Sequence, residues 1–146
     1  MAKRQKDVSV AMLDDLHTSG AGYDILRYIS LPGILGTEAS TLLYFMGKDL
    51  ARKLKPESLH DVYYTFEKLG WGRLDYVKEK RKAFVFTLMS DAVVRRLNAP
   101  INTEFRLEAG FLAESIQMIK EQPCECKEEI NNKIHQVVFT VFVTES

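Results

Sequence analysis

The sequence predicts a single α+β domain in which an antiparallel sheet carries helices mainly on one side. Two observations support this prediction. Apolar residues recur at helical spacing over much of the first 70 residues and again over 105–120, whereas they alternate with a two-residue period in two later pairs of segments. Each pair has a short connection, so the order is helices, hairpin, helix, hairpin. That order is typical of a four-stranded sheet with its helices segregated to one face.

The length and composition fit one globular domain. A chain of 146 residues, 46% hydrophobic and 27% charged, can bury a core without disulfides or a metal. Residues 1–19 show no sustained period. We therefore expect an N-terminal arm over 1–19, followed by a single α+β domain over 20–146.

The first helix is predicted over 23–30, with Ile25, Leu26 and Ile29 facing the core, and the Leu-Pro-Gly sequence of 31–33 should end it.

The second helix should run from Thr37, as its N-cap, to about Lys53. Its wide apolar stripe contains Leu42, Leu43, Phe45, Met46, Gly47, Leu50 and Leu54. The glycine at 47 costs about 1 kcal/mol of helix propensity relative to alanine. Such a glycine usually lets something pack closely, either another helix or a bound molecule. A third helix is expected to open at Pro56 and to end at Gly70.

The first predicted hairpin follows Gly70. Its apolar residues alternate with polar ones in both strands, and they are Leu74 and Tyr76, then Phe84, Phe86 and Leu88. A short loop or helical turn containing Arg95, Arg96 and Pro100 should connect this hairpin to the helix over 105–120.

The second hairpin is predicted to join strands 124–130 and 133–143 through Asn131-Asn132, a dipeptide that tolerates positive φ. One face of its last strand contains Val137, Phe139, Val141 and Val143. Because Val138 and Phe142 on the other face are also apolar, we expect this strand to be central and covered on both sides.

Charge and hydropathy exclude several classes of function. Twenty basic and twenty acidic residues give a formal net charge of +0, so no overall positive field would attract a nucleic acid. Two local basic clusters, Lys3, Arg4 and Lys6, and Lys78, Lys80, Arg81 and Lys82, are expected to be solvated. There is neither an apolar run long enough for a membrane span nor the apolar core of a signal peptide, which indicates a cytoplasmic protein.

The candidate binding residues are aromatic. Five aromatic side chains and one glycine could line a pocket between the helices and the sheet: Tyr44, Phe45, Gly47, Trp71, Phe105 and Phe111. The aromatic side chains could instead fill that space, and the close packing of protein interiors favours filling. The glycines of Gly70-Trp71-Gly72 should permit a tight helix-to-strand turn that places the indole in the core or in a pocket.

No catalytic constellation is visible. Glu104 and Glu108 are four residues apart and share a helix face, but local ion pairing with Arg106 is a simpler account than acid catalysis. The histidines, at 17, 60 and 135, lie in no metal or hydrolase motif.

A metal site would have to involve Cys124 and Cys126, the only cysteines. On a strand their thiols share one face, with Cα atoms about 6.6 Å apart, and Glu128 or His135 could add a ligand. A zinc signature usually has two ligand pairs and only one is present, so we expect ordinary packing, no metal and no cofactor.

Three stretches together resemble a known family. They are Leu-Pro-Gly-Ile-Leu-Gly at 31–36, Leu-Gly-Trp-Gly at 69–72 and Phe-Arg-Leu-Glu-Ala-Gly-Phe-Leu-Ala-Glu at 105–114. In this order and spacing they resemble the YslB-like family of small bacterial proteins. That family is a branch of the 4-vinyl reductase superfamily, which also contains TRAPP small subunits and the sensor domains of aromatic-responsive transcription activators.

The resemblance implies helices against a four-stranded antiparallel sheet, a homodimer, and an apolar pocket that holds a small hydrophobic ligand in some relatives. Many sensor relatives bind zinc near the final hairpin, but the corresponding positions here are Glu129 and Val137, which are not thiols. The leading hypothesis is therefore a non-enzymatic, homodimeric binding or assembly module. The alternatives are an enzyme or reductase-like accessory acting on an aromatic or tetrapyrrole compound, for which Arg106 or Arg95 would have to face the aromatic residues, and a zinc-dependent sensor.

Overall fold

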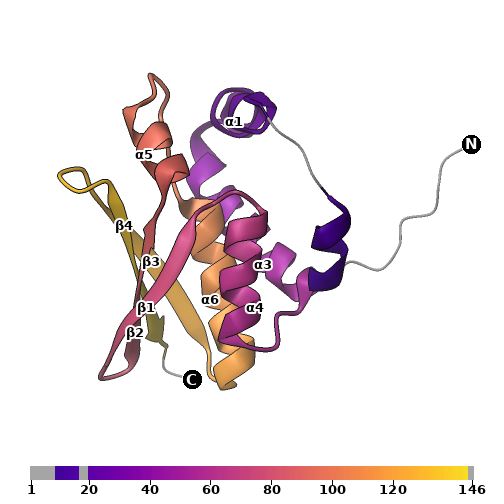
Figure 1. The fold of residues 1–146 in the computed structure, drawn as a ribbon. Coiled ribbons are helices and arrows are strands. Elements are labelled where there is room, and N and C mark those ends of the chain that lie inside the picture. The colour runs from indigo at the N-terminus through magenta and orange to yellow at the C-terminus, as the bar shows by residue number, and fades with distance from the viewer. Residues whose placement is uncertain (1–8, 17–19, 145–146) are drawn as a thin grey trace, which may run out of the picture.

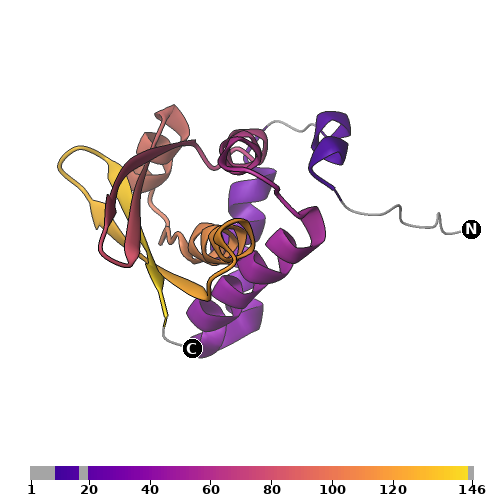
Figure 2. The same cartoon turned by 90° about the horizontal axis from the view of Figure 1, so that it is seen from below.

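The computed structural model describes residues 9–16 and 20–144, and it contains the four-stranded antiparallel sheet that the sequence predicts (Figure 1). The strands are β1 (Arg73–Lys80), β2 (Ala83–Met89), β3 (Cys124–Asn131) and β4 (Gln136–Val143). Their spatial order is β1-β2-β4-β3, so the last strand is central, as expected. Figure 2 shows the helical layer on one side of the sheet, which confirms the predicted fold class.

The helical layer begins with a 3₁₀ helix, η1 (Val10–Asp15), and a long helical stretch made of α1 (Gly22–Ile25), a π-helical turn (Leu26–Ser30) and α2 (Leu31–Leu35). It continues with η3 (Gly36–Glu38), α3 (Ala39–Leu54), α4 (Leu59–Lys68), α5 (Asp91–Asn98) and α6 (Arg106–Lys120). Among the helices of the described ranges, none is both long and apolar enough to cross a bilayer.

The prediction for the first helix is wrong in both its end and its buried face. The helix continues through Pro32. A proline has no backbone N–H to donate, and the π-helical turn at 26–30 lies where the helix would otherwise need that hydrogen bond. The apolar residues Ile25, Leu26 and Ile29 are 49%, 61% and 52% exposed, whereas Arg27 and Tyr28 are buried. The physical reason is a set of charge partners for the arginine, described below.

Helices α3 and α6 cross at two glycines. A Cβ on Gly47 would lie 2.7 Å from the Phe111 amide nitrogen, and one on Gly110 would lie 2.8 Å from the Tyr44 carbonyl carbon. Neither position has room for a side chain. The close approach predicted at Gly47 is therefore confirmed, and the closely packed neighbour is another helix.

Two predicted helix starts are wrong. Helix α3 begins at Ala39 after a 3₁₀ turn, so Thr37 is not its N-cap. Helix α4 begins at Leu59 and not at Pro56. The Ser58 hydroxyl accepts the Asp61 N–H at 3.3 Å, and a proline side chain has no oxygen that could cap the helix in this way.

The segment between the hairpins is more ordered than expected, since α5 forms a full eight-residue helix. Ser90 caps it by accepting the Val93 N–H at 3.2 Å. Arg95 and Arg96 lie in the last turn, where positive charge complements the helix dipole.

The second hairpin differs from its prediction in its turn and its outer face. Strand β3 extends to Asn131, so the turn is 132–135 and the positive φ, 50°, occurs at His135. Val138 and Phe142 face away from the helices and are only half-buried. The expectation that β4 is covered on both sides is therefore wrong, because the helices of the described residues pack on the other face.

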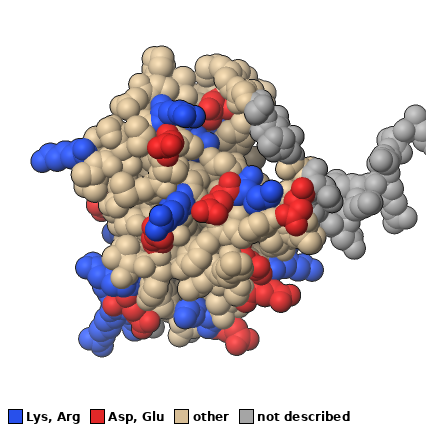
Figure 3. Space-filling view, in the orientation of Figure 1, with Lys and Arg blue, Asp and Glu red and all other residues tan. Residues whose placement is uncertain are grey.

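Surface charges are mixed, as a net charge of zero implies. Figure 3 shows basic and acidic side chains interspersed over one face of the molecule. The basic cluster in the β1–β2 turn (78–82) is exposed, as expected. The other basic cluster, Lys3, Arg4 and Lys6, lies outside the described residues, as does His17.

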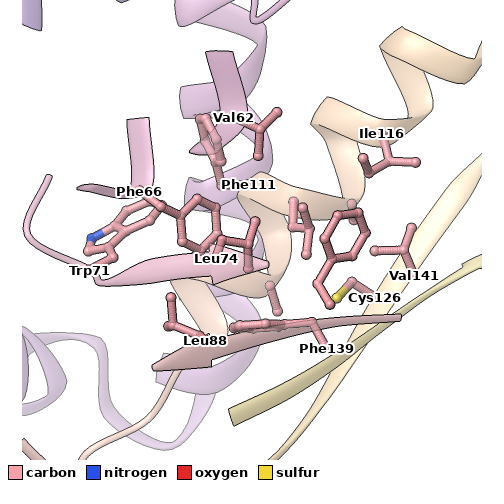
Figure 4. Packing of buried hydrophobic residues seen from close by; sticks show 14 of the residues in the cluster. Val62, Phe66, Trp71, Leu74, Leu88, Phe111, Ile116, Cys126, Phe139 and Val141 are labelled. Atoms are coloured by element: carbon pink, nitrogen blue, oxygen red, sulfur yellow. The ribbon is translucent and has the colours of Figure 1, made fainter. Parts of the chain in front are cut away.

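The core lies between the sheet and helices α4 and α6 (Figure 4). Phe66, Trp71 and Phe111 pack edge to face, with ring centroids 5.0 to 6.0 Å apart. Within the predicted arm, Leu13 is buried and joins this cluster. The division of the chain at residue 19 stays a prediction.

Candidate ligand-binding site

The six residues predicted to line a pocket lie in four places. Phe105, Phe111 and Trp71 are buried in the core, Tyr44 lies at the edge of β3, Phe45 is exposed on α3, and Gly47 lies at the helix crossing. The structure brings together Trp71 and Phe111, whose ring centroids are 5.5 Å apart. The aromatic set is thus mostly core, and among its members Trp71 lines one hollow and Phe45 another.

The cavity beside Trp71 has a volume of about 470 Å³ and lies between α1, α5, the end of α4 and the facing side chains of α3 and α6. Its walls come from six segments of the chain and consist of Leu16, Gly20, Tyr23, Asp24, Leu50, Lys68, Leu69, Gly70, Trp71, Arg96 and Leu107. Leucines provide the apolar walls, and a tyrosine, an aspartate, a lysine and an arginine provide the polar groups. A few polar groups in a mostly apolar hollow are typical of small-molecule sites.

The turn after α4 positions the indole. Gly70 and Gly72 adopt φ of 74° and 136°, values that L side chains rarely adopt. The Trp71 N–H then donates to the Phe66 carbonyl at 2.9 Å, and the indole Nε1–H donates to the Tyr23 hydroxyl at 3.0 Å. The predicted tight turn is confirmed, and it places the indole between the core and the cavity.

Arg96 connects this turn to α1. Its guanidinium donates to the carbonyls of Gly70 and Trp71, the latter at 3.2 Å, and pairs with Asp24 at 3.4 Å. Three of the five N–H donors of an arginine are used in this way. Among the described residues, no acceptor is bonded to its other two N–H groups, and its guanidinium carbon lies 5.9 Å from the centroid of the Tyr23 ring.

A buried ion cluster lies behind Tyr23. Arg27, only 2% exposed, makes two parallel bonds to Glu108, Nη1 to Oε2 at 2.8 Å and Nη2 to Oε1 at 2.6 Å. It also donates to Glu104 at 2.9 and 3.1 Å and to the Tyr23 hydroxyl at 2.9 Å. Tyr28 lies beside it, with its ring centroid 4.9 Å from the guanidinium carbon, and its buried hydroxyl has no hydrogen-bond partner among the described residues.

The charges in this cluster are held in place. Burial by itself lowers the pKa of Arg27, but the Glu108 carboxylate raises it by more than burial lowers it. The pKa is therefore raised overall, and the guanidinium stays protonated. Burial raises the pKa values of Tyr23 and Tyr28, and both hydroxyls stay neutral. The cluster joins the first helical stretch to the start of α6 and supports Tyr23 at the cavity wall.

The sequence prediction missed this cluster. The expectation that Glu104 and Glu108 share a helix face is wrong, because α6 begins at Arg106 and Glu104 precedes it. Both carboxylates bond Arg27, about 80 residues away along the chain. Arg106, the expected partner, instead pairs with Glu128 at 2.8 Å and stacks on the Tyr44 ring at 4.5 Å. The sequence feature that could have indicated this cluster is Arg27 itself, a charged residue between the apolar residues Leu26 and Ile29.

Tyr44 serves the sheet rather than the cavity. Its hydroxyl accepts the Cys126 amide N–H at 2.9 Å and donates to Glu125 at 2.6 Å. Lys48 pairs with the same carboxylate oxygen at 2.6 Å. These contacts fasten α3 to the outer edge of β3.

The cysteines are buried and unbonded to each other. Burial raises the pKa of both thiols, so neither is a ready thiolate for a metal or for nucleophilic chemistry. Of the expected extra ligands, Glu128 lies near Cys126 on β3 but pairs with Arg106, and His135 lies in the turn of the hairpin. Within the described part of the chain, no group of three or more potential ligands could hold a metal ion.

With this geometry established, comparison with known proteins identifies the family. A family described as a protein of unknown function, DUF2507, matches residues 20–142. The chain belongs to the DUF2507 family. It is 35% identical to the uncharacterized protein YslB of Bacillus subtilis over 139 residues, which cover 95% of this chain and 94% of that protein. The resemblance to YslB-like proteins is thereby confirmed.

Further comparisons of this DUF2507 protein give a more distant sequence match and two solved structures of similar fold. The uncharacterized protein MJ1642 of Methanocaldococcus jannaschii is 25% identical over 103 residues, 70% of this chain and 62% of that one. A vinyl-4-reductase family protein from M. jannaschii superimposes with a TM-score of 0.63 at 16% identity, covering 93% of this chain and 88% of its own. The phenol-responsive sensory domain of the transcription activator PoxR, solved with phenol, gives a TM-score of 0.57 at 17% identity, with coverages of 88% and 75%.

Proposed function

We propose that this DUF2507 protein is a non-enzymatic binding module that holds a small apolar molecule in the cavity beside Trp71 and works as a homodimer. The observation that carries the proposal is the cavity itself. Leu50, Leu69 and Leu107 provide apolar walls, and Tyr23 and Arg96 line the same space. A phenol-sensing domain of the same fold supports a ligand of this class.

The surroundings of the cavity support binding rather than catalysis. An enzyme acting on an aromatic compound would need a reactive polar group facing its substrate. Arg106 stacks on Tyr44 at the edge of the sheet, and Arg95 is exposed and lines an adjoining hollow of about 250 Å³ that shares Asp24 and Arg96 with the cavity. Glu108 is fully buried and bonded to Arg27, away from any substrate.

The helical side offers a surface for the second copy. Seven large apolar side chains there are between 40% and 82% exposed: Ile25, Leu26, Ile29, Ile34, Leu42, Phe45 and Met46. Because such a side chain can bury roughly 150 Å², the seven offer on the order of 600 Å² of apolar surface. That is most of the ~800 Å² that each partner buries in a standard interface. A net charge of zero gives no overall repulsion between two copies.

Ligand binding is tested by fluorescence of Trp71, the only tryptophan of the chain. Phenol and the apolar quencher 4-nitrotoluene should both change its emission in a saturable way. Leu69→Phe, which adds volume at the cavity wall, should weaken both effects severalfold, whereas Leu59→Phe, on the same helix but away from the cavity, should not. Saturable binding that Leu69→Phe leaves unchanged would contradict the proposed site.

Dimerisation is tested by native mass spectrometry and sedimentation. Wild-type protein should have the mass of two chains, and a small molecule bound during production should appear as extra mass that denaturation releases. Phe45→Glu should give monomers, and Val77→Glu, a control on the sheet with similar exposure (51% against 55%), should stay dimeric. A monomeric wild type would remove the dimer from the proposal.

A further inference from the structure

Two leucines belong to two hollows at once. Leu50 and Leu107 line the cavity beside Trp71, and they also line an outer apolar groove of about 680 Å³. The groove is otherwise formed by Leu35, Leu42, Phe45, Met46, Asp49 and Lys53. Both shared leucines are half-buried, so these two side chains form a common wall between the ligand cavity and the surface of the molecule.

The backbones behind this wall cannot move apart easily. Leu50 is three residues after Gly47, and Leu107 is three residues before Gly110, the two glycines at which α3 and α6 cross without room for a side chain. A change on one side of the wall therefore reaches the other side through the leucine side chains. A leucine can change rotamer within a fixed helix, whereas separating the helices would lose their packing.

The occupant that best fits the groove is a second copy of this chain. The only charged residues that line the groove are Asp49 and Lys53, which pair with each other at 2.8 Å. In a two-fold contact the aspartate of one copy can meet the lysine of the other, so the groove is complementary to itself in charge. Phe45, the most exposed aromatic side chain of α3, supplies the apolar anchor for such a contact.

We propose that docking of the second copy on this groove and binding of a small molecule in the cavity favour each other through Leu50 and Leu107. The inference rests on the proposed function and adds its regulation. A partner that packs against the two leucines fixes their rotamers, and a molecule entering the cavity then does not bear that ordering cost again. From the rotamer entropy of two leucines, the affinity for the small molecule should rise roughly three- to tenfold in the dimer.

The experiment measures the affinity of 4-nitrotoluene from Trp71 quenching at protein concentrations well below and well above the dimer dissociation constant. In wild-type protein the dissociation constant of 4-nitrotoluene should fall about three- to tenfold at the high protein concentration. In monomeric Phe45→Glu it should stay at the weaker value at both concentrations. Phe45 does not line the cavity, and Val77→Glu should behave as wild type.

A second variant tests the wall itself. Leu50→Val places a β-branched side chain in α3, where it has essentially one rotamer whether or not a partner is present. The concentration-dependent difference in affinity should therefore shrink, whereas the smaller side chain in the cavity wall changes the affinity by the same factor at both protein concentrations. If wild-type protein binds 4-nitrotoluene and dimerises but shows equal affinity at both concentrations, the coupling is overturned and the proposed function stands. If there is no saturable quenching, the proposed function fails and the coupling fails with it. If there is no dimer, the homodimer is removed from the proposed function and the coupling fails.

Discussion

Replacing Arg27 by methionine should be the most damaging single change on the helical side. Each of the five donors of its guanidinium is bonded, to Glu104, Glu108 or Tyr23. Methionine fills similar space but leaves a fully buried Glu108 carboxylate without its cation. Removing one partner of a buried ion pair costs about 3–5 kcal/mol, which for a chain of this size lowers Tm by roughly 10 °C.

Urea unfolding followed by Trp71 fluorescence and circular dichroism measures this loss. Arg95→Met, which removes an exposed arginine from the surface, should change stability by less than about 0.5 kcal/mol. The double variant Arg27→Met with Glu108→Gln should be more stable than Arg27→Met alone, because a neutral amide does not need the cation. A loss below about 1 kcal/mol for Arg27→Met, or a double variant no more stable than the single one, would refute the reasoning.

Three further predictions concern single contacts. Gly47→Ala should lose about 1–3 kcal/mol by overpacking the helix crossing, while Gly33→Ala, whose new Cβ meets nothing within 4 Å, should lose nothing; equal urea midpoints for the two variants would contradict the close crossing. Tyr23→Phe removes the acceptor of the indole N–H, so the emission of Trp71 should shift and about 1–3 kcal/mol should be lost; an unchanged spectrum would argue against that bond. Burial tends to raise the pKa of Glu125, but its bonds to a lysine and a tyrosine hydroxyl lower it overall. Its stabilising contribution is therefore present at neutral pH and is lost as pH falls below about 4, so Glu125→Gln should flatten the acid side of a plot of stability against pH.

The sheet could be predicted from the sequence because its signal is local. Leu74, Phe84, Phe86 and Leu88 alternate with polar or outward-facing residues over a few positions, and the register of β1 with β2 follows from that alternation. The close approach at Gly47 was also visible, because a glycine inside an apolar stripe is costly unless something packs against it.

The candidate site could not be predicted in the same way, because it is assembled from distant segments. Helical periodicity places apolar residues in the core, and it therefore predicts that Ile25, Leu26 and Ile29 are buried. Arg27 is buried instead because it bonds Glu104 and Glu108, which are about 80 residues away and cannot be recognised from the sequence of the first helix. Likewise, the wide apolar stripe of α3 contains both buried core residues and the exposed Phe45, and hydrophobicity alone does not distinguish a core position from an exposed apolar one.

The Tyr44 hydroxyl at the edge of β3 has a consequence for aggregation. An unpaired strand edge can template the addition of further strands, and here the Cys126 amide N–H is already bonded to a side chain from α3. At the opposite edge, β1 has an irregular register between Tyr76 and Lys78 and ends in the exposed, alternating charges of 78–80. Both borders of the sheet therefore discourage strand-by-strand growth, and a protein with so much exposed apolar surface on its helices can associate there without seeding fibrils.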